Sequence, residues 1–302
     1  MAKKIALVNN KGGSSKTTTA VNIAGAYATK YPEKKILIAE TAGPGTATRS
    51  FNLRAKSFEK SMYDVFMGNH KAEEVVVNAL DNIDIIPANG DMNFVEFDLM
   101  ATYEIANSRG VYSAIKELTP QQFNNMTMED FEGYVDDKVS VKLTDNYFNM
   151  LEGKFDELDK EYDLIIFDTP PEIKAITSSV LSIADHVIIP YEPDTYSVEG
   201  VINMLGRIQS IQERYNSDLA IAGILAVKVQ SRTLLHGEVR NRMMKYCMKS
   251  GINYFDSEIP NSIRFASSTS FNGLPATITM KDNTFVQSYY DLLEELVEKD
   301  IV

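Results

Sequence analysis

The sequence predicts an α/β fold in which a mostly parallel β-sheet is flanked by helices. Short apolar runs of strand length alternate along the 302 residues with longer segments of helical periodicity. A glycine-rich loop, residues 9–19 (NNKGGSSKTTT), separates the first apolar run, 5–8, from the first helical segment. A strand, a glycine loop and a helix in this order form a phosphate-binding turn, so we expect an anionic ligand at that end of the sheet.

The remaining elements continue the alternation. We expect strands at 35–39, 83–87, 164–167, 187–190 and 220–228, and helices at 17–29, 94–118, 149–162, 197–215, 234–250 and 285–299. Residues 61–80 also have helical periodicity, which is interrupted at Gly68. The helix expected between the first two strands makes them a βαβ unit, and such a unit joins parallel strands.

We expect one domain over residues 1–302, with an acidic helical insertion at about 119–147. The insertion opens with Thr119 and Pro120, is irregular, and contains Met, Phe and Tyr residues that favour a small helical excursion packed against another surface. Its negative charge would repel DNA, so we expect it to contact protein.

Composition excludes several classes of protein. The net charge of -12 argues against a surface coated in basic residues, although a local basic patch can still contact nucleic acid. The single cysteine, Cys247, excludes an intramolecular disulfide framework, a multi-cysteine zinc site and a cysteine-held iron–sulfur cluster within one chain. The three histidines are scattered without metal-ligand or catalytic-triad spacing. With no run of about 18 apolar residues and no leader-like N-terminus, we expect a cytoplasmic protein.

The glycine loop carries the chemistry of phosphate binding. Lys16 is placed to neutralise β- and γ-phosphates, and Thr17 to bind magnesium. The strict pattern G-x-x-x-x-G-K-[ST] fails, because Asn10 and Ser15 stand where it has glycine. Asp168 ends the apolar strand 164–167, where a carboxylate near the loop can hold a hydrated Mg²⁺ ion.

Six segments in order strengthen this interpretation: KGGSSKTTTAVNIA, KKILIAETAGPGTAT, IDIIPAN, YDLIIFDTPPEI, DHVIIPYEPDTYSVEG and EIPNSIRFASSTSFNGLP. Together they resemble the ParA/MinD family of deviant Walker A P-loop ATPases, and most closely the ParA-type DNA partition branch. The resemblance spans nearly the whole chain outside the insertion. It implies a P-loop fold, ATP and Mg²⁺ as cofactors, and an ATP-dependent homodimer.

The resemblance also implies roles for particular residues. Lys11 would reach across the dimer interface to the nucleotide of the partner. Magnesium would be held by Thr17 and Asp168, and catalytic roles would fall to Lys11, Lys16, Glu40 and Asp168. The implied nucleotide contacts are Lys11, Gly12, Gly13, Ser14, Ser15, Lys16, Thr17 and Thr18.

The loop after the second strand departs from the family pattern. Family members have two aspartates spaced i, i+2 here, and the second helps to orient the attacking water. Glu40 takes the first position and Ala42 the second, so no carboxylate remains at the water-orienting position. Phosphoryl transfer depends on positioning, and we therefore expect ordinary or tight ATP binding with slow hydrolysis.

A second informative stretch is basic within an acidic chain. The segment 228–249 contains one acidic residue, Glu238, and six basic ones: Lys228, Arg232, Arg240, Arg242, Lys245 and Lys249. Such a run is either a solvated helix face or a patch that contacts DNA phosphates without reading sequence, in which case binding would depend steeply on salt.

The sequence thus predicts an ATP-dependent dimeric switch that partitions plasmid, phage or chromosomal DNA. The implied partners are non-specific DNA and a ParB-like centromere-binding protein, which places the protein on the nucleoid. A non-hydrolysing ATP-binding scaffold or filament protein, or a MinD-like positioning ATPase, remain alternatives. The last helix ends in the acidic sequence EELVEKDIV, which disfavours the membrane-binding tail of MinD-like relatives.

Overall fold

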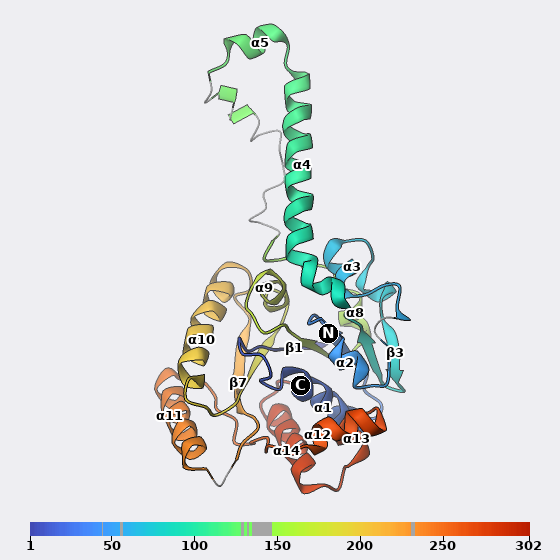
Figure 1. Cartoon of the computed structure of the whole chain (residues 1–302), viewed down its shortest axis with the longest axis vertical. Helices are drawn as coiled ribbons and strands as arrows, with labels where there is room; N and C mark the ends of the chain where they lie inside the picture. The colour runs from blue at the N-terminus through green and yellow to red at the C-terminus, as the bar shows by residue number, and fades with distance from the viewer. Residues whose placement is uncertain (44, 55–56, 128–129, 132, 135–146, 231–232) are drawn as a thin grey trace.

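The computed structural model describes residues 1–43, 45–54, 57–127, 130–131, 133–134, 147–230 and 233–302. These residues contain a seven-stranded sheet of order β3-β4-β2-β5-β1-β6-β7 (Figure 1). The strands are β1 (Lys3–Leu7), β2 (Ile36–Glu40), β3 (Val77–Leu80), β4 (Ile83–Ile86), β5 (Leu164–Asp168), β6 (His186–Tyr191) and β7 (Ala220–Ala226). Every neighbouring pair is parallel except β3 and β4, so the predicted α/β fold with a mostly parallel sheet is confirmed.

Helices cover both faces of the sheet. One face carries α3 (Met62–Met67), α8 (Leu158–Glu161), α9 (Ala175–Leu181), α10 (Ser197–Arg214), α11 (Leu234–Ser250) and the base of α4 (Val95–Glu117). The other carries α1 (Lys16–Lys30), α2 (Thr46–Arg49), α12 (Arg264–Ser267), α13 (Ala276–Thr279) and α14 (Thr284–Glu298). Successive residues of β2 alternate between the two apolar cores, and all five are buried, as expected for a parallel strand covered on both sides.

The direction in which successive strands are added to the sheet reverses at β1, which has β5 on one side and β6 on the other. The connection through α1 leads to β2 on the β5 side, whereas β6 and β7 extend the sheet the other way. In open α/β sheets ligands bind at the carboxyl ends of strands beside such a switch point. The glycine loop follows β1 and therefore occupies this position.

Helix α4 projects from the body as an arm, with α5 (Pro120–Asn125) at its far end (Figure 1). Its base is anchored by two contacts: Glu96 Oε1 accepts the Ala175 N–H at 3.0 Å, and the Tyr63 hydroxyl donates to Asp98 Oδ2 at 2.7 Å. The projection thus begins within α4, before the boundary predicted at 119. Most of the predicted insertion, including 135–146, lies outside the described residues, so its extent and its protein-contacting role stay predictions.

Two helical predictions are wrong in part. In the segment 61–80, helix α3 is followed by a short 3₁₀ turn (Ala72–Glu74) and then by β3, because the apolar residues near its end pair with β4 at the edge of the sheet. Within 149–162 only Leu158–Glu161 is helical. The rest forms turns, in which Gly153 has a φ of 70° and the Met150 N–H donates to Ser179 Oγ.

The other described elements are 3₁₀ helix η3 (Gly90–Phe94) and a π-helical turn, η4 (Ser268–Asn272). None of the helices in the described ranges combines the length and the apolar character that a bilayer-spanning segment requires.

Candidate functional site

The loop between β1 and α1 folds around the side chain of Lys16. Lys16 Nζ donates to the Asn9 carbonyl oxygen at 3.0 Å, and the side chain is buried. Burial lowers the pKa of Lys16, and the charge of nearby Asp168 partly offsets this effect. Gly13 (φ 74°) and Ser15 (φ 62°) adopt left-handed backbone conformations. Glycine does so without steric cost, which explains why the strict pattern has glycine at the position that Ser15 occupies.

Asp168, at the end of β5, faces the beginning of α1. β5 runs parallel to β1 with Asp168 beside Leu7, which brings the carboxylate to the loop. Thr17 Oγ1 donates to Asp168 Oδ2 at 2.6 Å, whereas Asp168 Oδ1 is buried without a hydrogen-bond partner among the described residues. Burial raises the pKa of Asp168 to about 6, opposed by the Thr17 hydrogen bond and the Lys16 charge.

Two orphaned oxygens make the loop suited to a phosphate and a metal ion. Ser14 Oγ is buried and, like Asp168 Oδ1, has no hydrogen-bond partner in the described part of the chain. A buried polar atom without a partner costs about 1–3 kcal/mol, which a ligand that satisfies it would recover. The Thr17 hydroxyl and the Asp168 carboxylate, 2.6 Å apart, are the hard oxygen donors that a hydrated Mg²⁺ ion prefers. The residues present therefore fit an anionic phosphate held with Mg²⁺.

A cavity of about 300 Å³ adjoins the loop. Ser15, Thr17 and Thr18 line one side of it, and the segment 259–262 lines another. The glycine loop pattern could not identify this second wall, which is more than two hundred residues away in the chain. The only signal for it in the sequence was the family-like segment EIPNSIRFASSTSFNGLP.

Glu40, at the end of β2, is completely buried and fully hydrogen-bonded. Its carboxylate accepts the N–H groups of Ala47 at 2.7 Å, Thr48 at 3.2 Å and Ala88 at 3.4 Å, and the Thr48 hydroxyl at 2.6 Å. Burial raises the pKa of Glu40 to about 7; the Thr48 and Ala47 hydrogen bonds oppose the rise, and the Asp168 charge adds to it. Both carboxylate oxygens are therefore occupied by hydrogen bonds from the chain itself, and the catalytic role expected of Glu40 stays a prediction.

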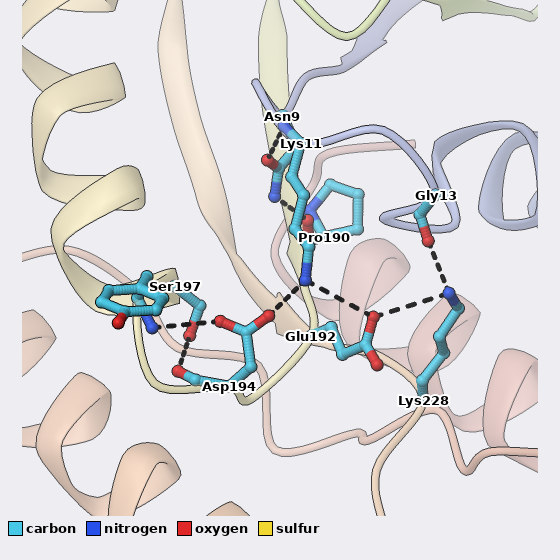
Figure 2. Close-up of polar contacts among 9 residues, drawn as sticks. Asn9, Lys11, Gly13, Pro190, Glu192, Asp194, Ser197 and Lys228 are labelled. Atoms are coloured by element: carbon cyan, nitrogen blue, oxygen red, sulfur yellow. Dashed lines mark hydrogen bonds and ion pairs between the residues drawn. The ribbon is translucent and has the colours of Figure 1, made fainter.

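Lys11 is directed to the loop after β6, as Figure 2 shows. Its ammonium forms an ion pair with Asp194 and lies 3.9 Å from Glu192 Oε2. The hydrogen bond to Asp194 raises the pKa of Lys11, and about half of the side chain is exposed. The predicted reach of Lys11 to a partner subunit stays a prediction.

Lys228 lies at the glycine loop and not with the basic residues of α11. Its Nζ donates to the Gly13 carbonyl oxygen at 2.6 Å and is 3.5 Å from Glu192 Oε2 (Figure 2). Lys228 also lines the cavity beside Thr17. The charge of Lys228 is thus engaged at the phosphate loop, and its predicted contact with DNA stays a prediction.

Arg240, whose predicted contact with DNA stays a prediction, is paired with an acidic residue of the same chain. Its guanidinium forms an ion pair with Glu258, and only 24% of its side chain is exposed. Arg232, another residue of the predicted patch, lies outside the described residues.

The exposed part of α11 keeps three of the predicted basic residues, Arg242, Lys245 and Lys249. They line a shallow hollow of about 560 Å³ together with Glu238, Asn241 and Tyr246. Arg242 is 62% exposed and lies 3.6 Å from Glu199 of α10. A basic surface thus exists on α11, but it is smaller than the sequence predicted.

Comparisons with known proteins identify the family of the chain. A family model, AAA_31, described as an AAA domain, matches residues 2–124 and 133–221. The chain is 26% identical to the sporulation initiation inhibitor protein Soj of Bacillus subtilis, over 98% of both chains. It is 28% identical to the chromosome-partitioning ATPase Soj of Thermus thermophilus, over 89% of this chain and 85% of the relative.

Among solved structures, the chain is similar to cobyrinic acid a,c-diamide synthase from Mycobacterium smegmatis with a bound ATP analogue and magnesium, with a TM-score of 0.70. The two chains are 20% identical, and the match covers 99% of this chain and 95% of that one. This likeness concerns the fold. The family model covers well over half of the chain, and the chain belongs to the AAA_31 family and is a ParA/MinD-type P-loop ATPase.

Proposed function

We propose that the protein is an ATP-dependent dimeric switch of the ParA type that binds DNA non-specifically and partitions plasmid, phage or chromosomal DNA. The observation that carries this proposal is the phosphate loop, where Lys16, Thr17 and Asp168 converge. Within the described ranges, Ser14 Oγ and Asp168 Oδ1 are buried there without a hydrogen-bond partner. The chromosome-partitioning name of the Thermus relative supports the choice of cargo.

In this proposal the β- and γ-phosphates of ATP lie against the N–H groups of the loop and the Lys16 ammonium. Thr17 and the Asp168 carboxylate hold Mg²⁺, which when bound neutralises charge on the phosphates. The 300 Å³ cavity between Thr18 and the segment 259–262 takes the nucleoside. Lys11, half-exposed and held by Asp194 in its own subunit, exchanges this partner for the nucleotide of the second subunit.

Intrinsic hydrolysis is slow in this proposal because no carboxylate orients the attacking water. Ala42 has no polar side chain, and the nearest acidic residue along the chain, Glu40, is buried with four hydrogen bonds. A loss of about 100-fold in rate corresponds to roughly 2.7 kcal/mol of barrier.

The Ala42→Asp variant tests this step. Restoring the carboxylate should raise the steady-state rate of phosphate release in the presence of DNA, with ATP affinity unchanged. A wild type that already hydrolyses ATP faster than the variant would contradict the assignment of Ala42.

Ala42 and the buried Glu40 also favour a second candidate, a non-hydrolysing ATP-binding scaffold or filament protein. Phosphate release separates the two candidates. A ParA-type switch should release phosphate faster when DNA and the ParB-like partner are added, whereas a scaffold should show no stimulation.

DNA binding is assigned to the exposed face of α11, where Arg242 and Lys245 line the hollow with Lys249. These cations contact phosphates and not bases, so binding should weaken steeply with salt. Two copies of the surface come together when ATP pairs the subunits, which makes DNA retention dependent on ATP. A double Arg242→Ala and Lys245→Ala variant should bind ATP normally and lose retention on non-specific DNA. Unchanged retention at moderate salt would exclude α11 as the DNA surface.

A further inference from the structure

We infer that Lys228 is a positioning residue of the nucleotide site, which orients the phosphate loop through the Gly13 carbonyl group. The inference rests on the proposed binding of ATP by this loop. It assigns to the nucleotide site a residue that lies more than two hundred positions beyond the loop, in the segment between β7 and α11.

The contact orients one peptide group. Lys228 Nζ donates to the Gly13 carbonyl oxygen at 2.6 Å. Because a trans peptide is planar, the Ser14 N–H at the other end of this group points in the direction opposite to the carbonyl. Holding the carbonyl toward Lys228 therefore presents the Ser14 N–H on the other side of the loop backbone. Unpaired N–H groups presented in this way are the donors with which a glycine-rich loop holds phosphate.

The charge of Lys228 adds to the effect of its geometry. A cation at the carbonyl end polarises the peptide group, which makes the N–H at its other end a stronger donor. Gly13 has a φ of 74°, a conformation open to glycine at no steric cost, so the loop depends on outside contacts to hold this peptide in place.

The backbone of Lys228 is held by its surroundings. Its φ is 53°, in the left-handed region that non-glycine residues adopt at a cost of about 1 kcal/mol or more. The next residue, Val229, pairs with the segment 259–262, which follows α11: its N–H donates to the Ile259 carbonyl oxygen and its carbonyl accepts the Asn261 N–H, both at 3.0 Å. This segment also lines the cavity beside the loop. A strained conformation maintained at a cavity wall is typical of a functional position.

Glu192 completes the arrangement from the loop after β6. Its Oε2 lies 3.5 Å from Lys228 Nζ and 3.9 Å from Lys11 Nζ, so one carboxylate stands between two cations (Figure 2). The Glu192 carboxylate compensates the charge of Lys228, and the Lys228 ammonium keeps its hydrogen bond to the Gly13 carbonyl oxygen. A lysine engaged by a carbonyl and a carboxylate is poorly placed to contact DNA.

The test compares nucleotide and DNA affinities of Lys228→Met, Lys228→Arg and the wild type. Lys281→Met, which changes an exposed lysine in the same way, is the matched control. Titration calorimetry with ADP and with the slowly hydrolysed analogue ATPγS, both with Mg²⁺, gives the nucleotide affinities. DNA retention is then measured at ATPγS concentrations that saturate each variant.

Lys228→Met should weaken the binding of both ADP and ATPγS by roughly 10- to 100-fold, the range expected from the loss of a charge-assisted hydrogen bond. Lys228→Arg, which keeps a cationic donor, should recover most of the affinity, and Lys281→Met should leave it unchanged. At saturating ATPγS, Lys228→Met should retain DNA like the wild type.

Three results would overturn the inference. Lys228→Met could bind nucleotide like the wild type, or lose DNA retention at saturating ATPγS with its nucleotide affinity intact, which would return Lys228 to the DNA surface. Equal losses in Lys228→Met and Lys228→Arg, with lowered melting temperatures, would indicate a structural role. If the wild type itself bound neither nucleotide, the proposed function would fail first and this inference with it.

Discussion

Because burial raises the pKa of Glu40, the free energy of unfolding of the protein should fall as the pH rises. The perturbation is Glu40→Gln, which keeps the size of the side chain and removes its titration. The pKa of Glu40 is raised by burial from 4.5 to about 7, so between these values the folded chain binds the proton that the unfolded chain releases. Stability from this group is complete below about pH 4.5 and is lost as the pH rises through about 7.

The magnitude follows from the two pKa values. Each pKa unit is worth about 1.4 kcal/mol, and integration from about pH 5 to about pH 8 gives a loss of roughly 2 kcal/mol in the free energy of unfolding of the wild type. Glu40→Gln lacks this contribution. The glutamine NH₂ group also faces backbone N–H donors, and the resulting destabilisation is the same at every pH.

The assay is urea unfolding of both proteins without nucleotide at several pH values in this range. The difference between wild type and variant should change by roughly 2 kcal/mol across the range, with the wild type losing stability as the pH rises. Parallel pH profiles would refute the reasoning, because they would show that Glu40 is already ionised in the folded chain below about pH 5.

Three further predictions concern the site and its surroundings. Asp168→Asn should lower the Mg²⁺ dependence of ATP binding by about 10- to 100-fold while leaving binding without Mg²⁺ nearly unchanged, as measured by calorimetry with and without the ion; equal Mg²⁺ dependence would exclude Asp168 as a ligand. Lys11→Ala should bind ATP as a monomer and fail to dimerise with ATP in sedimentation velocity, and a normal ATP-dependent dimer would contradict its role between subunits. Arg240→Ala should lower the free energy of unfolding by about 2–4 kcal/mol, because Glu258 loses its partner in a partly buried pair. Lys245→Ala, at the exposed hollow, should change the free energy of unfolding by less than about 0.5 kcal/mol. If the loss in Arg240→Ala were as small as that in Lys245→Ala, the Arg240–Glu258 pair would not stabilise the fold.

Much of the fold could be predicted from local patterns. The strand at 164–168, the helix at 234–250 and the loop around Lys16 were predictable because apolar periodicity and glycine punctuation act over a few residues. The edge strand β3 was not, because its pairing with β4 across a tight turn outweighed a helical pattern in the preceding residues.

The sequence by itself determined the chemistry of the phosphate loop, since Lys16, Thr17 and the strand-ending Asp168 belong to elements that their own residues specify. Only the tertiary structure decided which partner each basic side chain contacts. Lys228 and Arg240 stand in one basic run of the sequence, yet the first contacts Gly13 and the second Glu258. The physical reason is that a long charged side chain takes the partner that folding brings within reach, and that partner can come from any part of the chain.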